Sequence, residues 1–171
     1  MKNLLSAVLP VFVLMLCASV LHAEELSLDA LKARITGLYT LEEWHKDGEI
    51  FRPPQVEGRF ILINGTIMTI LDSKTQPSSR ATSVFIGRYE MVAEKFSYEY
   101  DTVSIFSEEG DIIKASHKPL WDGVRVFVPS VEGDVVRLRA ESGQEIVFTN
   151  EGSKYFDKGK LVRQWRRSSD K

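Results

Sequence analysis

Cysteine is almost missing from this chain, and its scarcity narrows the chemistry that the protein can perform. The single cysteine among 171 residues, Cys17, lies within an apolar N-terminal run. It follows Leu16, whereas a lipoprotein signal usually places a small residue before the modified cysteine, so we interpret Cys17 as an apolar leader residue. Removal of the leader would leave a chain without disulfides or thiol chemistry, which an apolar core alone must stabilise.

Motifs for metals, nucleophiles and phosphates are missing too. The sequence has no Asp-x-Asp-x-Asp-Gly loop and no His-x-x-x-His pair, so we predict no metal site. It also has no Gly-x-Ser-x-Gly and no Gly-x-x-x-x-Gly-Lys segment. The common hydrolase and nucleotide-dependent classes are therefore disfavoured, and no cofactor is expected.

Basic residues are not in excess. Lys and Arg number 22 against 24 Asp and Glu, which gives a formal net charge of −2, and loss of Lys2 lowers it to −3. No nucleic-acid partner is expected from such a balance. Three arginines do gather near the C-terminus, and we interpret them as the solvated face of a terminal strand: Arg163, Arg166 and Arg167.

Only one long apolar run occurs, from Leu4 to Leu21, and it follows the basic flank at Lys2. This arrangement predicts a Sec-type signal peptide over residues 1–23, cleaved after Ala23, and hence a secreted or periplasmic protein. An uncleaved membrane anchor is the alternative, which Pro10 and the short basic flank disfavour. After cleavage no stable membrane span is expected.

The remaining segment, residues 24–171, has the length and composition of one globular domain. Ser27 can cap a short helix that Gly37 ends. The apolar face of that helix comprises Leu28, Leu31 and Ile35.

Beyond Gly37 the hydrophobic period becomes two, and turn dipeptides such as Asn64-Gly65 separate the segments. Pro53-Pro54 is a connector, and the polar segment 73–83 is predicted to be a long loop, either a lid or a plain connection. The predicted strands are 38–46, 49–52, 58–64, 66–72, 83–92, 96–106, 111–117, 123–129, 134–140, 144–149 and 160–167.

About eight or more antiparallel strands without a long helix must close into a barrel or stack as a sandwich, because open edges invite aggregation. The pattern alone allows both. It predicts an all-β fold preceded by one short helix, and it does not specify the oligomeric state.

Several short motifs occur in one order along residues 28–167: Gly37-Leu38-Tyr39, Asp47-Gly48, the proline pair, Gly58-Arg59-Phe60, Asn64-Gly65, Gly87-Arg88-Tyr89 and Gln164-Trp165-Arg166. This order resembles the lipocalin-like domains of bacteria. The resemblance implies an antiparallel up-and-down barrel that holds a small, largely apolar molecule. It also implies that an arginine from near the chain end covers the aromatic ring on the first strand. Tyr39 takes the place of the usual tryptophan, and Arg163, Arg166 or Arg167 would supply the guanidinium.

Alternation along three strands suggests which side chains line such a barrel. One face of each strand is rich in aromatic or branched residues, opposite polar residues such as Arg125. The alternative is that these side chains only fill the core. The predicted ligand-binding residues are Phe85, Tyr89, Met91, Phe96, Tyr98, Tyr100, Val124, Val126 and Val128.

Catalytic candidates are few. Outside the leader only His45 and His117 titrate near neutral pH, and His117 lies at a predicted strand end. His117 and Tyr89 are therefore the candidate acid/base groups, although a surface histidine is the plainer interpretation.

Three functions follow from this pattern. The first is an exported lipocalin-like protein that binds a small hydrophobic or amphipathic ligand inside its barrel. The second is a barrel enzyme of the isomerase, cyclase or hydratase type. The third is an envelope module that docks a protein partner. Fold alone does not choose among them.

Overall fold

The computed structural model describes residues 27–76, 79–117 and 123–168. The predicted leader, residues 1–23, lies outside them. Within the described residues the chain forms one helix and twelve strands. The elements are α1 (Leu28–Ile35), β1 (Gly37–Lys46), β2 (Glu49–Phe51), β3 (Val56–Ile63), β4 (Thr66–Gln76), β5 (Ser79–Val92), β6 (Lys95–Glu109), β7 (Ile112–His117), β8 (Arg125–Glu132), β9 (Val135–Arg139), β10 (Gln144–Phe148), β11 (Gly152–Asp157) and β12 (Lys160–Arg167).

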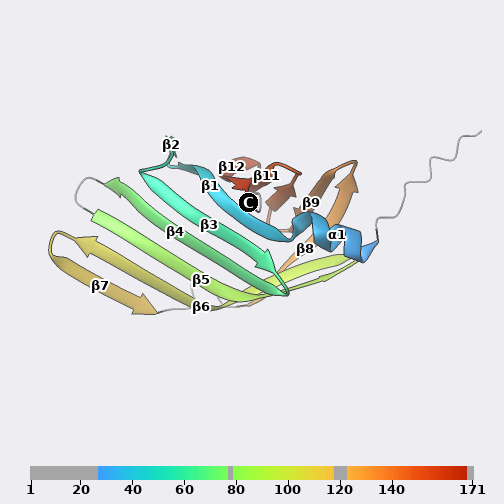
Figure 1. The fold of residues 1–171 in the computed structure, drawn as a ribbon, viewed down its shortest axis with the longest axis horizontal. Coiled ribbons are helices and arrows are strands. Elements are labelled where there is room, and N and C mark those ends of the chain that lie inside the picture. The colour runs from blue at the N-terminus through green and yellow to red at the C-terminus, as the bar shows by residue number, and fades with distance from the viewer. Residues whose placement is uncertain (1–26, 77–78, 118–122, 169–171) are drawn as a thin grey trace, which may run out of the picture.

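The predicted helix is confirmed. The Ser27 hydroxyl accepts a hydrogen bond from the Ala30 amide at 3.2 Å, which satisfies one of the free donors of the first turn. Leu31 and Ile35 are buried, and Figure 1 shows α1 at one end of the sheet beside β9. One apolar face therefore anchors this short helix against the barrel.

Ten of the strands close into an antiparallel barrel in the described part of the chain, with β2 and β7 off the closed path (Figure 1). Consecutive strands are neighbours, and β12 returns to pair with β1, where Tyr39 lies opposite Arg167 and Leu41 opposite Trp165. The predicted all-β, up-and-down antiparallel barrel with a short N-terminal helix is thus confirmed, and closure excludes the sandwich.

Strand β6 has two partners along one edge. It pairs with β8 at Phe96–Tyr98 and with β7 at Ser104–Glu109. A bulge in the β5–β6 pair, between Ile86 and Gly87, lies between these two pairings. Bulges increase local twist, and the sheet accordingly divides here into the barrel wall and an outer part that ends in β7. We call the Ser104–Glu109 segment of β6 together with β7 the lip.

The predicted loop over 73–83 is wrong. Strand β4 continues to Gln76 and β5 begins at Ser79, with Asp72 opposite Thr82. The Arg80 guanidinium donates to the Asp72 carboxylate at 2.9 Å, across the two strands. Polar cross-strand contacts stabilise this hairpin, and polar side chains on both faces show no hydrophobic alternation.

Strand β11 was not predicted at all. It begins at Gly152, where a Cβ atom would lie 2.0 Å from the Trp165 carbonyl oxygen. A glycine at the start of a polar segment is a poor strand signal by composition, yet the close approach of β12 requires it.

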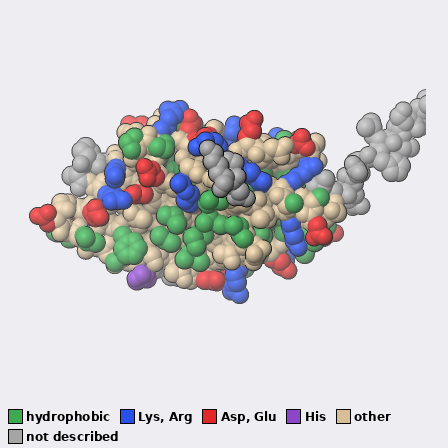
Figure 2. All heavy atoms as spheres, viewed as in Figure 1, with side chains coloured by type: hydrophobic (Ala, Val, Ile, Leu, Met, Phe, Trp, Pro, Cys, Tyr) green, Lys and Arg blue, Asp and Glu red, His purple; other side chains and the backbone are tan. Residues whose placement is uncertain are grey.

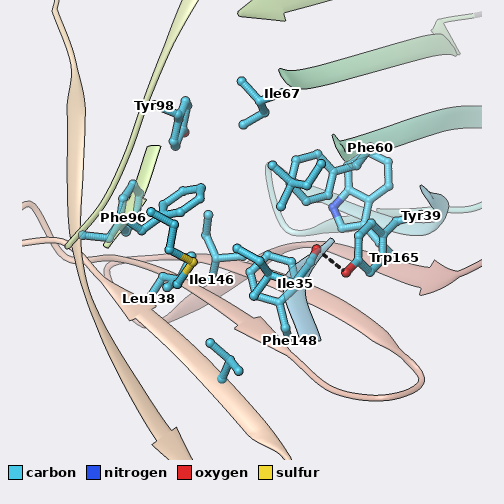
Figure 3. Packing of buried hydrophobic residues seen from close by; sticks show 14 of the residues in the cluster. Ile35, Tyr39, Phe60, Ile67, Phe96, Tyr98, Leu138, Ile146, Phe148 and Trp165 are labelled. Atoms are coloured by element: carbon cyan, nitrogen blue, oxygen red, sulfur yellow. Dashed lines mark hydrogen bonds between the residues drawn. The ribbon is translucent and has the colours of Figure 1, made fainter. Parts of the chain in front are cut away.

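An aromatic cluster forms the centre of the core. The ring of Tyr39 lies 5.5 Å from that of Phe60 and 5.9 Å from that of Phe148, and Trp165 lies 5.8 Å from Phe60. Figure 3 shows this group together with Ile35 of the helix, whose carbonyl accepts a hydrogen bond from the Tyr39 hydroxyl at 2.8 Å. The cluster joins α1 to the two strands that close the barrel.

The visible surface carries lysine, arginine and acidic side chains in close alternation, with hydrophobic side chains gathered towards its middle (Figure 2). The one helix of the described ranges, α1, is too short to cross a membrane.

Candidate functional site

The barrel contains a cavity of about 290 Å³. Eight of the ten barrel strands contribute to it, and β1 and β9 do not. It is lined by Phe60, Ile67, Thr69, Phe85, Tyr98, Tyr100, Arg125, Gln144, Ile146, Ser153, Tyr155, Arg163 and Trp165. In Figure 3, Ile67 and Tyr98 lie apart from Phe60 and Trp165. All four of these side chains line the cavity.

One wall is aromatic and comes from β5 and β6. The ring of Tyr100 lies 5.3 Å from that of Phe85 and 5.4 Å from that of Tyr98. Thr69 and Tyr100 share a hydrogen bond of 3.1 Å between their hydroxyls. The structure thus brings three predicted lining residues, Phe85, Tyr98 and Tyr100, into one cavity wall.

The tyrosine hydroxyls of the cavity stay protonated at neutral pH. Burial raises the pKa of Tyr98 and Tyr100, and it raises the pKa of Tyr155 as well. Burial disfavours the phenolate because a charge is poorly solvated there. These groups therefore act in the cavity as neutral hydrogen-bond donors and acceptors.

Two arginines enter the cavity from different strands. Arg125 of β8 donates to the Tyr98 hydroxyl at 3.3 Å and lies 5.9 Å from the centre of that ring. Arg163 of β12 lies 5.5 Å from the centre of the Trp44 ring. Burial lowers the pKa of Arg163, but a guanidinium remains charged at any physiological pH.

The interpretation of Arg163 as part of a solvated face is wrong. Arg163 and Trp165 lie two residues apart on β12 and so share the inner face, opposite Tyr155 and Ser153 of β11. Arg166, on the outer face, is exposed as predicted and pairs with Glu42 at 3.3 Å.

The predicted inward orientation of Val124, Val126 and Val128 is also wrong. Their exposed fractions are 55%, 50% and 62%, whereas Phe127 is fully buried. Phe127 lies opposite Phe96, and Arg125 shares its parity, so the inner face of β8 carries the arginine. The sequence around β8 is hydrophobic at both alternate sets of positions, so alternation did not indicate which set points inward. A charged side chain was assumed to point outward.

The remaining predicted lining residues lie in packed core rather than in the cavity wall. Phe96 and Met91 are buried, and the ring of Tyr89 packs at 5.7 Å from that of Phe96. These three side chains therefore fill the core, as the alternative interpretation of the sequence expected. The interior has a packed part, which contains them, and a hollow part around Tyr100 and Arg163.

The two described histidines, His45 and His117, are not part of the cavity. His117 is exposed on β7, where its Nδ1 lies 2.9 Å from the Ser104 hydroxyl, and it forms no part of the cavity lining. His45 of β1 lies 2.8 Å from a carboxylate oxygen of Glu43. The described ranges contain no group of three or more potential metal-ligating side chains.

An arginine does cover the ring of Tyr39, and it is Arg167. Its guanidinium lies 5.4 Å from the ring centre and donates to the Tyr39 hydroxyl at 2.9 Å. The same nitrogen donates to the carbonyl of Thr36 at 3.1 Å and to that of Arg34. Arg167 thereby joins the last strand, the first strand and the helix C-terminus, where a cation is favourable.

Ten of the thirteen cavity residues were not predicted as ligand contacts, although Arg125 and Arg163 were noted and assigned outward positions. Tyr155 and Ser153 lie on the strand that was missed, and Thr69 and Gln144 lie on strands that were predicted. The available signal was a polar residue between large apolar residues two positions away on the same strand. It marks Thr69, between Ile67 and Leu71 on β4, and Arg163, between Leu161 and Trp165 on β12.

Fold and cavity together define the class: a closed, up-and-down antiparallel β-barrel with an internal cavity of mixed aromatic and cationic lining. No protein-family model, no curated protein and no solved structure matches the chain.

Proposed function

We propose that this protein is an exported, lipocalin-like binding protein that holds a small hydrophobic or amphipathic molecule inside its barrel. The single observation that carries the proposal is the cavity beside Tyr100, which side chains from much of the barrel surround. Ligand sites are typically concave, mostly apolar and provided with a few convergent polar groups. The cavity is concave, and its aromatic and aliphatic side chains lie beside several convergent polar groups.

The volume of the cavity limits the size of the ligand that it can hold. About 290 Å³ lies at the lower end of the range for small-molecule sites. It corresponds to roughly ten water molecules at about 30 Å³ each, which suits a ligand of roughly 10 to 15 non-hydrogen atoms. The lining supports binding over catalysis, since its tyrosines are held neutral and it contains no histidine or carboxylate among the described residues.

Tryptophan fluorescence offers a direct test because Trp165 lines the cavity. The purified protein would be titrated with a panel of small apolar and amphipathic compounds, including alcohols and fatty acids of eight to twelve carbons. We expect a saturable change with at least one compound, and negative ΔCp by calorimetry as apolar surface is buried.

A pair of variants localises the binding. Ser153→Phe places a ring in the cavity and removes no hydrogen bond, because the Ser153 hydroxyl has no described partner. Lys154→Phe adds the same ring on the exposed, outward side of the same strand. We expect binding to be lost in the first variant and kept in the second. Equal binding by both folded variants would place the ligand elsewhere.

A further inference from the structure

The charged residues in the described cavity lining are all basic. Arg125 and Arg163 are its two charged lining residues, and no aspartate or glutamate appears in the described lining. On the outer surface arginines pair with carboxylates, as Arg80 does with Asp72 and Arg52 with Glu43, whereas Arg163 pairs with no described carboxylate. The cavity therefore concentrates positive charge where solvent screening is weak.

Arg163 has no anionic partner among the residues that the structure describes. Its Nε is buried and makes no hydrogen bond within the described structure, and neither an ion pair nor a hydrogen bond joins its guanidinium to another described residue. The groups that influence it electrostatically are the tyrosine hydroxyls around it. A buried cation without an anionic partner costs free energy even where it lies over a ring, as Arg163 does over Trp44, and a bound anion would offset that cost.

A second unsatisfied donor lies nearby. The Ser153 hydroxyl is buried, lines the same cavity and has no described hydrogen-bond partner. In the register of β11 and β12, Ser153 lies opposite Trp165 and Tyr155 lies opposite Arg163, so Ser153 and Arg163 are diagonal neighbours on the inner face. Two unused donors on adjacent strands thus face one hollow.

We propose that the ligand is a small anion with an apolar body, whose carboxylate accepts hydrogen bonds from Arg163 and Ser153. The apolar body lies against the aromatic wall of Phe85 and Tyr100. This assignment rests on the proposed binding function and names the chemical class of its ligand. A guanidinium fork suits a carboxylate because both are planar and can form two parallel hydrogen bonds.

The test compares three ligands with one ten-carbon chain and different head groups: decanoate, 1-decanol and decylammonium. Calorimetry and tryptophan fluorescence at about pH 7, below the micelle concentration, would give each Kd. We expect decanoate to bind about tenfold or more tightly than 1-decanol, and decylammonium to bind most weakly, because a charge-assisted hydrogen bond is roughly twice as strong as a neutral one.

Variants assign the preference to the cavity. Arg163→Met removes the charge at similar volume and is expected to equalise decanoate and 1-decanol, while 1-decanol binding persists and shows that the barrel is folded. Arg166→Met, on the outer face of the same strand, should leave the preference intact. Ser153→Ala should weaken decanoate several-fold and 1-decanol hardly at all, which gives a milder second variant.

The failures are distinguishable. Equal affinity of the unaltered protein for decanoate and 1-decanol, or a preference for decylammonium, would overturn the anionic head group and leave the binding function standing. A preference for decanoate that survives Arg163→Met would remove Arg163 from the site. Binding of none of the three ligands, and of no member of the wider panel, would overturn the binding function and the head group together.

Discussion

Removal of the Arg167 guanidinium should measurably destabilise the fold. The side chain lies 5.4 Å from the Tyr39 ring centre and donates to the Tyr39 hydroxyl and the carbonyls of Thr36 and Arg34. A cation over an aromatic face contributes about 0.5 to 2 kcal/mol. Two helix-end carbonyls that lose a charged donor add roughly 1 kcal/mol each, because water can partly replace it. We expect Arg167→Ala to lower the free energy of unfolding by about 2 to 4 kcal/mol.

Urea unfolding at 25 °C, followed by circular dichroism and tryptophan fluorescence, would measure this change by linear extrapolation. Arg166→Ala is the matched control. The Arg166 side chain is exposed, and its ion pair with Glu42 should contribute at most about 1 kcal/mol. Added salt should shrink the small Arg166 effect and spare the Arg167 effect. If the two variants differ by less than about 0.5 kcal/mol, the proposed role of Arg167 in joining helix and strands is incorrect.

Three further outcomes follow from packing and burial. Gly87→Ala should lower stability by about 1 to 3 kcal/mol or prevent folding, because the added Cβ would lie 1.8 Å from the Glu99 carbonyl oxygen. The control Gly37→Ala meets only ordinary contacts, at 3.6 Å, and thermal melts of both variants would show the difference. Phe127→Ala should cost about 3 to 5 kcal/mol and Val126→Ala under about 1 kcal/mol, and urea midpoints that rank them the other way would contradict the orientation of β8. Burial raises the pKa of the core tyrosines in the folded protein, so the unfolded chain releases its phenolic protons at a lower pH than the folded chain. Their contribution to stability should therefore be complete below pH ~10 and should be lost as the pH rises above it. A phenolate absorbance titration of native and unfolded protein would check the sign.

Much of the architecture could be predicted from the sequence because local rules determine it. Ser27 and Gly37 bound the helix, and Asn64-Gly65 makes a two-residue turn with positive φ at both positions. Closure into ten strands depends instead on the pairing of β1 with β12, which are separated by most of the chain. Local periodicity does not report such a pairing.

The site was harder to predict than the fold because inner and outer faces differ by one residue of register. On β5 and β6 one parity is clearly aromatic, and Phe85, Tyr98 and Tyr100 were placed correctly in the interior. On β8 both parities are apolar, so the assumption that a charge faces water put the valines inside and Arg125 outside. An inward arginine violates that general rule, and such violations concentrate at functional sites.

The division of β6 between two partners gives the molecule two levels of local stability. In the barrel each strand has a neighbour on both sides, whereas β7 pairs with β6 alone within the described residues. Its side chains Ile112 and Ile113 are 59% and 71% exposed, so little apolar burial holds the lip in place. Amide protons of β7 should therefore exchange with solvent through local opening, hours ahead of those in β10 and β12, which open only when the whole barrel unfolds.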